Sequence, residues 1–397
     1  MVIVGAGPAG STTALALLHA RPELEGRVLL LERARFPREK PCAGALGARG
    51  DALLRGLGVE IFVPSAPIDG IALLGTRGEV SASPGAIGRV VRRIEFDHAL
   101  AHTASSRGAR LRDGVRVDDV RDEGEAGVVV ETTQGPVRAR IVVGCDGVGS
   151  LVRKKLGQGA GRLRAQVVEV DTEAVPGDKA RSLLVFDATD VTLSGYAWDF
   201  PTVVDGRPLV CRGVYRLKID GEDDGDGIDV AAKLDARLRR QGIDPSKCKN
   251  RRYAERGFEA TARVAGGALM LAGEAAGIDP VTGEGIAQAI EYGVLAGPFL
   301  ASRLERPGTA SVDDWSRVLA RSRLARDLRI RARLMRFFYG PDRLEVERFL
   351  LDSPDALFVG CQHFAMQPHD WLQVGEVVAR GGARLLARRL ASSLGAR

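Results

Sequence analysis

The order of apolar and polar positions predicts a βαβ unit at the start of the chain. Val2–Val4 and Val28–Leu31 are apolar runs that predict buried strands, and Ser11–Ala20, rich in Ala and Leu, predicts a helix between them. A GxGxxG turn, Gly5 to Gly10, joins the first strand to the helix, and Glu32 follows the second strand. An acid about 20 residues past the glycines is typical of a dinucleotide site. The glycines let backbone N–H groups approach a pyrophosphate, and the acid accepts hydrogen bonds from a ribose.

The rest of the chain alternates between strand-like and helical patterns. Further strands are predicted between Leu163 and Tyr215 and at Ile71–Leu74, Glu79–Ser83, Val115–Val120, Gly127–Thr132, Pro136–Val143 and Gly267–Gly273. The three strands between Val115 and Val143 predict a β-meander. Helices are predicted through Phe96, Leu100 and Ala104, over Ile228–Gln241 and Gly285–Leu304, and from Ser311 to the end, with loops near Pro341 and Pro354. This order predicts an α/β fold in which a β-rich insertion interrupts a parallel nucleotide-binding core.

Two further glycine-marked turns follow predicted buried strands and carry a carboxylate. One is Gly144-Cys145-Asp146-Gly147, and the other begins at Gly273-Glu274 and continues to Gly285. Ligands of open α/β sheets bind at the carboxyl ends of the strands. Three such turns predict a ligand longer than NAD(P), and FAD fits that requirement.

These motifs resemble those of FAD-dependent oxidoreductases of the p-hydroxybenzoate hydroxylase superfamily, most closely the geranylgeranyl-reductase-like branch. Phe36 to Leu46 resembles a segment in which a cysteine lies beside the flavin, Arg92-Arg93-Ile94-Glu95-Phe96-Asp97 resembles RRxxFD, and Asp279 to Ile286 resembles the flavin-ring turn. The resemblance implies a Rossmann-like FAD-binding domain with an inserted β-sheet substrate domain and C-terminal helices. It implies cofactor contacts from Gly5, Gly7, Ala9, Gly10, Glu32, Arg33, Cys42, Ala43, Ala45, Arg93, Asp146, Gly147, Glu274, Gly285 and Ile286.

The resemblance also divides the chain into domains. We expect the discontinuous FAD-binding domain at 1–66, 88–157 and 263–310, the substrate domain at 67–87 and 158–262, and a helical region at 311–397.

The segment Tyr196-Ala197-Trp198-Asp199-Phe200-Pro201 resembles the YxWxFP motif of geranylgeranyl reductases. By resemblance, Tyr196, Trp198, Phe200 and Pro201 form an apolar substrate pocket. Alternate residues of a strand share a face, so a purely structural core role is the competing interpretation. Where the family has GxG, this chain has Cys211-Arg212-Gly213, which leaves the length of the substrate open. Cys42, Tyr196 and Trp198 are the candidate catalytic residues.

Composition excludes several classes of protein. The five cysteines include no CxxC pair and the five histidines have no metal-ligand spacing, so we expect neither a disulfide scaffold nor a metal site. No apolar run approaches the roughly 18 residues of a membrane span, and Met1 leads directly into the first strand, so we expect a cytoplasmic protein without a signal peptide. The net charge of +6 lies after Ala301, where 17 arginines face 11 acids. No nucleic-acid motif accompanies that charge, so peripheral contact with a membrane is the alternative to a solvated surface.

Together these features predict an FAD-dependent oxidoreductase that reduces a C=C bond of an apolar or lipidic metabolite. NAD(P)H or another external donor would supply electrons, and a carrier or membrane could present the substrate. The first alternative is a flavin-dependent monooxygenase, a hydroxylase before a halogenase. The second is a flavin-binding or membrane-docking accessory protein without turnover. No feature of the sequence indicates an oligomeric state.

Overall fold

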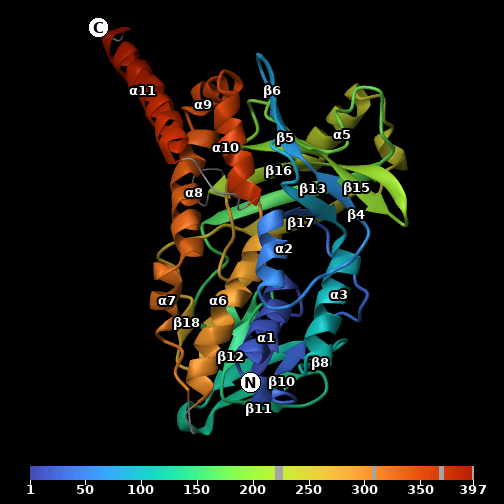
Figure 1. Cartoon of the computed structure of the whole chain (residues 1–397), viewed down its shortest axis with the longest axis vertical. Coiled ribbons are helices and arrows are strands. Elements are labelled where there is room, and N and C mark those ends of the chain that lie inside the picture. The colour runs from blue at the N-terminus through green and yellow to red at the C-terminus, as the bar shows by residue number, and fades with distance from the viewer. Residues whose placement is uncertain (220–226, 306–309, 366–370, 396–397) are drawn as a thin grey trace.

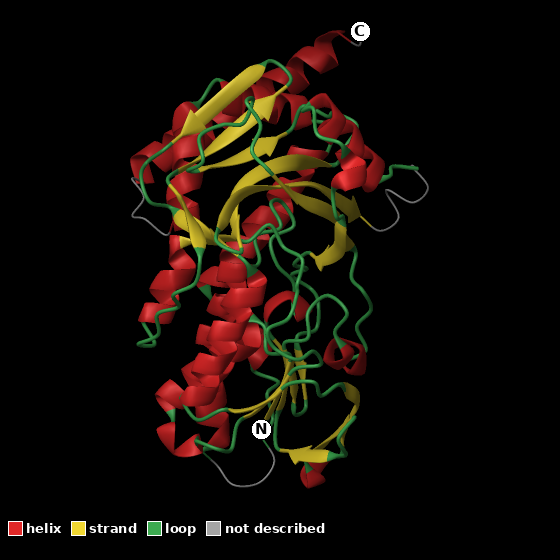
Figure 2. Ribbon diagram, turned by 90° about the vertical axis from the view of Figure 1, so that its right-hand side faces the viewer, coloured by secondary structure: helices red, strands yellow, loops and turns green. Residues whose placement is uncertain are grey.

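Two large sheets organise the residues that the computed structural model describes, which are 1–219, 227–305, 310–365 and 371–395. One sheet lies in the lower half of Figure 1 near the N-terminus, and the other crosses the upper half. Figure 2 shows the same two halves, one above the other, from the side. The functional question is therefore what lies between these sheets.

The lower sheet is a parallel nucleotide-binding sheet with one antiparallel edge strand. Its order is β18 (Ala265–Gly266), β19 (Leu269–Leu271), β12 (Val142–Gly144), β1 (Val2–Val4), β2 (Leu29–Leu31) and β8 (Arg110–Arg112). Strands β1, β12 and β19 are completely buried and wholly apolar apart from Gly144, as expected when helices cover both faces of a parallel sheet. The predicted βαβ unit and the strand near Gly267–Gly273 are confirmed.

Helices α1 (Pro8–Ala20) and α6 (Ile286–Leu304) pack closely beside this sheet, and α3 (Arg93–Ser106) also packs against α1. Glycines make the close approach of α6 to α1 possible: a Cβ on Gly297 would lie 2.4 Å from the Cβ of Ala16. Helix α1 begins at Pro8, three residues before the predicted start, because proline is well suited to the first position of a helix.

The predicted β-meander is wrong at its third strand. The antiparallel sheet contains β9 (Val117–Asp122), β10 (Val128–Thr132) and β11 (Val137–Ala139). The chain then leaves it, and β12 pairs in parallel with β1 and β19. Val142 and Val143 are completely buried, as expected for a central strand of a parallel sheet whose two faces are both covered.

The upper sheet has seven strands. Its order is β17 (Arg251–Arg256), β13 (Leu163–Thr172), β16 (Arg207–Ile219), β15 (Gly195–Val204), β14 (Leu183–Asp187), β5 (Gly70–Gly75) and β6 (Gly78–Ala82). Helix α5 (Val230–Arg240) covers one face, where Leu234 and Leu238 join a core with Val168 and Val214. The opposite face carries Trp198 and Tyr215. Strand β5 pairs in parallel with β14, so a segment before residue 88 completes a sheet of residues after 158. The domain boundaries themselves stay a prediction.

Several short elements were not predicted. They are β3 (Ala45–Gly47), α2 (Ala48–Arg55), β4 (Ser65–Ile68), β7 (Gly88–Val91), α4 (Leu151–Lys155) and the 3₁₀ turns η1 (Pro22–Leu24), η2 (Gly124–Ala126), η3 (Pro245–Lys247) and η4 (Gly273–Ala275). Segments of this length are too short to show a period in the sequence.

The C-terminal region is helical, as predicted. It contains α7 (Trp315–Arg321), α8 (Arg323–Tyr339), α9 (Arg343–Leu351), α10 (Pro354–Ala365) and α11 (Trp371–Gly395), with breaks beside Pro341 and Pro354. In Figure 1 these helices run along one side of both halves, and the end of α11 projects away from the body. Met335 of α8 and Cys361 of α10 are buried in the same core as Trp198. The C-terminal helices therefore complete the core under the upper sheet.

Candidate functional site

One cavity of about 2010 Å³ runs between the two sheets. It begins at the carboxyl ends of β1 and β2, passes under β15 and β16, and ends among α8, α9, α10 and α11. The residues expected around a cofactor all line this cavity except Gly10, and the expected pocket residues all line it except Pro201. Whether each of them contacts FAD stays a prediction.

The glycine turn forms the first part of the wall. Gly5 has a φ of 98°, and a Cβ there would lie 2.4 Å from the carbonyl oxygen of Cys145. Gly10 packs against the turn: a Cβ built at this position would lie 1.9 Å from the carbonyl oxygen of Gly5. This close packing explains why glycine is needed at position 10, and the expected contact of Gly10 with the cofactor stays a prediction. A Cβ built on Gly7 would touch only side-chain atoms, at 3.6 Å or more, and Gly7 begins α1 without a side-chain cap. Unpaired N–H groups at a helix N-terminus are a site for an anion.

Two guanidinium groups lie beside this helix start. Arg93 donates two hydrogen bonds to the carboxylate of Asp97, at 2.6 and 2.7 Å, and Arg38 Nη2 lies 3.0 Å from the same carboxylate. A Cβ built on Gly7 would lie 3.6 Å from Arg93 Nη2 and 3.7 Å from Arg38 Nη2, and these two nitrogens are its nearest neighbours. Arg38 Nε also lies 3.4 Å from Glu32 Oε2, so the two guanidinium groups and the carboxylates of Asp97 and Glu32 form one buried network beside the helix start. Sequence reasoning found Arg93 and missed Arg38, because Arg38 belongs to no motif that predicts a phosphate contact.

Glu32 is held at the end of β2. Its carboxylate accepts hydrogen bonds from the N–H groups of Ala6 at 3.2 Å and Ala34 at 3.1 Å, and only 6% of the residue is exposed. Arg33 follows it in the cavity wall. The acid therefore has a fixed orientation before any ligand binds.

The segment containing Cys42, Ala43 and Ala45 crosses the middle of the cavity. The Cys42 N–H donates to Glu169 Oε1 at 3.0 Å, and the Gly44 N–H donates to the Cys42 sulfur at 3.4 Å. Burial raises the pKa of the Cys42 thiol, although nearby Arg93 opposes the shift. Cys42 therefore presents a neutral thiol.

Two other carboxylates meet near the turns at Gly147 and Gly273. Asp146 accepts hydrogen bonds from the Ser150 hydroxyl at 2.5 Å and the Leu151 N–H at 2.7 Å, so it also holds the start of α4. Burial raises the pKa of Asp146. Glu274 has a buried Oε1 without a hydrogen-bond partner among the described residues. Glu274 is therefore the more available acceptor for a ligand.

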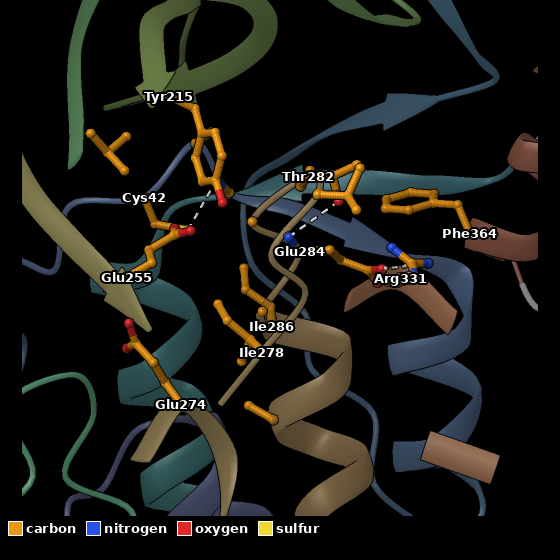
Figure 3. A pocket seen from close by; sticks show the side chains of 18 of the residues that line it. Cys42, Tyr215, Glu255, Glu274, Ile278, Thr282, Glu284, Ile286, Arg331 and Phe364 are labelled. Carbon is orange, nitrogen blue, oxygen red and sulfur yellow. Dashed lines mark hydrogen bonds and ion pairs between the residues drawn. The ribbon is translucent and has the colours of Figure 1, made fainter. Parts of the chain in front are cut away.

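A second helix start faces the cavity at Gly285 and Ile286. Helix α6 begins there without a side-chain cap, and Ile286 is buried. The loop before it is tied to α8, because Arg331 forms ion pairs with Asp279 and, at 3.4 Å, with Glu284. Figure 3 shows Arg331 beside Glu284, with Ile278 and Ile286 below.

The aromatic wall comes from β15 and β16. Tyr196 stacks on Tyr215 with 5.1 Å between ring centres, and its hydroxyl donates to the carbonyl oxygen of Thr282. Trp198 and Phe200 follow on the same face, and Trp198 is 2% exposed. These side chains line the cavity and also belong to the buried core, so the two interpretations of the motif do not exclude each other. Pro201 is the next residue of the strand and is buried outside the cavity wall, and its expected pocket role stays a prediction.

The unusual Cys211-Arg212-Gly213 segment does not narrow the cavity. Cys211 is absent from the cavity wall, and its thiol donates to Glu169 Oε2 at 3.8 Å. Gly213 receives the Trp198 ring, since a Cβ there would lie 2.1 Å from Trp198 Cζ2. Gly213, the second glycine position of the family's GxG, is therefore the one that packing against Trp198 requires, and this chain keeps it.

Sequence reasoning missed most of the far end of the cavity. There the wall is apolar and comes from four helices, with Phe337, Phe338, Phe349, Leu350, Leu357 and Phe364 among its members. It also missed Tyr253 and Glu255 of β17. Tyr253 and Glu255 are two residues apart, so on a strand they share a face, and this spacing is the signal that the sequence offered. In the structure both are half-buried, whereas Ala254 between them is exposed.

The described residues contain neither a membrane-length apolar helix nor a cluster of three metal-binding side chains.

Comparison with known proteins gives a consistent result. The family model described as "FAD binding domain" matches residues 1–317. The chain is 31% identical over 321 residues to a protein named menaquinone reductase from Mycobacterium tuberculosis, covering 76% of each. It is 29% identical to digeranylgeranylglycerophospholipid reductase 1 from Methanopyrus kandleri, covering 78% of this chain and 82% of the relative. A geranylgeranyl bacteriochlorophyll reductase-like structure from Thermoplasma acidophilum shares the fold, with a TM-score of 0.65, 20% identity and coverage of 96% and 94%.

Proposed function

This chain belongs to the FAD binding domain family, and on that premise we propose that it uses FAD to reduce a C=C bond of a lipidic metabolite. The observation that carries the proposal is the continuous cavity, which joins a charged end to an apolar end past Cys42 and Tyr196. A cofactor and an apolar substrate therefore have adjoining sites in one space. NAD(P)H or another two-electron donor would supply the reducing equivalents.

The residues at the charged end fit FAD. The uncapped start of α1 at Gly7 lines the cavity, and the guanidinium groups of Arg93 and Arg38 lie beside it. A diphosphate would accept charge-assisted hydrogen bonds from these groups. Glu32 would hold the ribose, and the unpartnered Oε1 of Glu274 would accept a hydrogen bond from the ribityl chain.

Bound and reduced, FAD supplies a hydride, which is a hydrogen nucleus with two electrons. The chain's own residues prepare the surroundings. The uncapped start of α6 at Gly285 favours negative charge next to it. Tyr196, Trp198 and Phe200 keep water away from an apolar substrate.

The substrate that we propose is a lipid with a long apolar chain. The names of two relatives point to menaquinone and to a digeranylgeranyl lipid. The apolar wall beyond Tyr196, built from α8 to α11, supports a ligand of that kind.

We also propose that the lipid enters from a membrane surface at α8 and α11. Ile330, Leu334 and Val378 line the cavity and yet are 48%, 41% and 68% exposed. Exposed apolar side chains at a cavity entrance are suited to contact with a lipid surface.

The test uses purified holoprotein under anaerobic conditions. The protein is reduced chemically and mixed with menaquinone or a digeranylgeranyl lipid in detergent, and the lipid products are analysed by mass spectrometry. We expect products that have gained two hydrogens, in step with the return of oxidised-flavin absorbance; FAD without protein is the control. A product that gains oxygen only in air would favour the monooxygenase alternative. Flavin oxidation without any lipid product would refute the proposal.

A further inference from the structure

Glu255 is an acid in the cavity wall that the cofactor contacts proposed above do not use. It lies on β17, and Figure 3 shows its side chain beside Cys42 and below Tyr215. Its Oε2 is buried and has no hydrogen-bond partner within the described part of the chain. Buried polar groups are almost always paired, so an unpaired carboxyl oxygen in a cavity requires an explanation.

The position of this carboxyl group is fixed against the loop that leads into α6. A Cβ built on Gly283 would lie 2.5 Å from Glu255 Oε2 and 3.0 Å from Tyr215 Cε2. The carboxyl group therefore occupies the space directly over Gly283. Gly285, two residues later, begins the helix start that faces the cofactor end of the cavity. Glu255 thus lies where the charged end and the apolar end meet.

A second carboxyl group nearby, that of Glu169, has a purely structural role and serves as a comparison for Glu255. Glu169 of β13 accepts hydrogen bonds from the Cys42 N–H, Arg251 Nε and the Tyr253 hydroxyl, at 3.0 to 3.1 Å. It is completely buried and ties three segments together. Glu255 lies on the neighbouring strand, but its Oε2 holds no second segment among the residues that the structure describes.

The other proton-bearing groups here are engaged with the protein. The hydroxyl of each cavity-lining tyrosine in the described ranges donates to a protein oxygen: Tyr196 to Thr282, Tyr215 to Pro280, Tyr253 to Glu169 and Tyr339 to Val281. The Cys42 thiol remains, but a thiol is a weaker acid than a carboxyl group, and burial raises its pKa further. Glu255 is therefore the strongest acid in this part of the wall whose proton is not already donated.

The surroundings favour the protonated form of this carboxyl group. Burial raises its pKa well above the ordinary value, and neighbouring carboxylates raise it further, with one cation opposing. The charged groups that face it are Glu274, Glu169 and Asp279, which raise the pKa, and Lys40, which lowers it. Its uncharged titratable neighbours are Cys42, Tyr196, Tyr215 and Tyr253.

We propose that Glu255 is the proton donor of the reaction, an inference that rests on the proposed C=C reduction. Saturating a C=C bond adds a hydride to one carbon and a proton to the other. The hydride comes from the reduced cofactor, and its electron pair forms the first C–H bond. The Glu255 O–H bond breaks, the π electrons of the C=C bond form the second C–H bond to that proton, and the O–H electron pair stays on the carboxylate. Glu255 then takes up a proton from solvent.

The test compares Glu255→Gln with the wild type and with Glu259→Gln. Glutamine keeps the size of the side chain but has no acidic proton. Glu259 lies four residues further along, outside the cavity wall, and pairs with Arg256. In single-turnover reduction of menaquinone, we expect Glu255→Gln to be slower by about 100-fold or more, in the range of general acid catalysis. Glu259→Gln should stay within about threefold of the wild type, and all three proteins should bind FAD equally.

A second readout does not depend on turnover. Infrared difference spectra of the holoprotein between neutral and high pH should show the carbonyl band of a protonated carboxyl group, and Glu255→Gln should lack that band. A wild type without the band, or a Glu255→Gln protein that turns over within threefold of the wild type, would overturn the assignment. A wild type that reduces no lipid C=C bond would refute the proposed function itself, which separates the two failures.

Discussion

The two ends of the cavity are built in different ways. At the glycine-turn end, charged groups are paired before any ligand binds: Arg93 with Asp97, and Glu32 with two backbone N–H groups. At the other end the wall is aromatic and aliphatic, and the acid at its border, Glu255, has an unpartnered oxygen. The comparison teaches that most charged groups of the cofactor site are held by protein contacts before a ligand binds, and Glu274 Oε1 is an exception. A substrate site keeps its apolar surface and its reactive group available.

The most severe change is expected at the glycine-turn end. In Gly10→Val the new Cβ would lie 1.9 Å from the Gly5 carbonyl oxygen, so the turn and the start of α1 cannot keep their positions. We expect complete loss of FAD, measured as flavin released on denaturation. Gly375→Val is the matched control, because nothing lies within 4 Å of a Cβ on Gly375. Normal FAD content in Gly10→Val would show that the turn does not hold the cofactor.

The apolar end should respond differently to a large truncation. Trp198→Ala removes a ring that is 2% exposed, which should cost about 3–5 kcal/mol of stability. The same ring lines the cavity, so binding of an apolar ligand should weaken while the folded protein still holds FAD. A melting curve, flavin content and ligand titration measure the three effects. Loss of stability with unchanged ligand affinity would leave Trp198 as a core residue only.

A smaller effect is expected from Glu32→Ala. Loss of charge-assisted hydrogen bonds to a ribose is worth about 1.5–3 kcal/mol, which should weaken FAD binding roughly 10- to 100-fold. The variant also leaves the Ala6 and Ala34 N–H groups without their acceptor, so a modest loss of melting temperature should accompany it. FAD titration of the apoprotein tests this prediction, and unchanged affinity would contradict the ribose role.

The smallest effect is a pH dependence of stability at the junction. The pKa of Glu255 is raised on folding, so the folded protein holds its proton to higher pH than the unfolded chain does. The contribution of Glu255 to the free energy of unfolding is fully present below its pKa in the unfolded chain. It is lost as pH rises toward its pKa in the folded protein, by at most about 1.4 kcal/mol per pH unit. Above pH 4.5, the ordinary pKa of a glutamate, wild type should therefore lose stability relative to Glu255→Gln as pH rises. Denaturant unfolding of both proteins across pH measures this, and parallel curves would refute the raised pKa.

The features that the sequence predicted correctly are local. A GxGxxG turn, an apolar run and an acid after the second strand lie within residues 2–32, and each depends on backbone geometry or burial over a few residues. The helical C-terminal region was predicted for the same reason. Gly10 and Pro201 lie outside the cavity wall, because a motif does not specify which of its residues face a cavity.

The sequence by itself determined the nucleotide-binding βαβ unit, the glycine turns and the aromatic strand, since these follow from periodicity and backbone conformation. Only the tertiary structure decided that Arg38 joins Arg93 at one carboxylate, that α8 to α11 close the apolar end, and that Glu255 lies over Gly283. The pairing of β17 with β13 aligns Glu255 with Ala165, 90 positions away in the chain. No pattern within a strand specifies such a partner, because long-range pairing depends on how the sheets pack together.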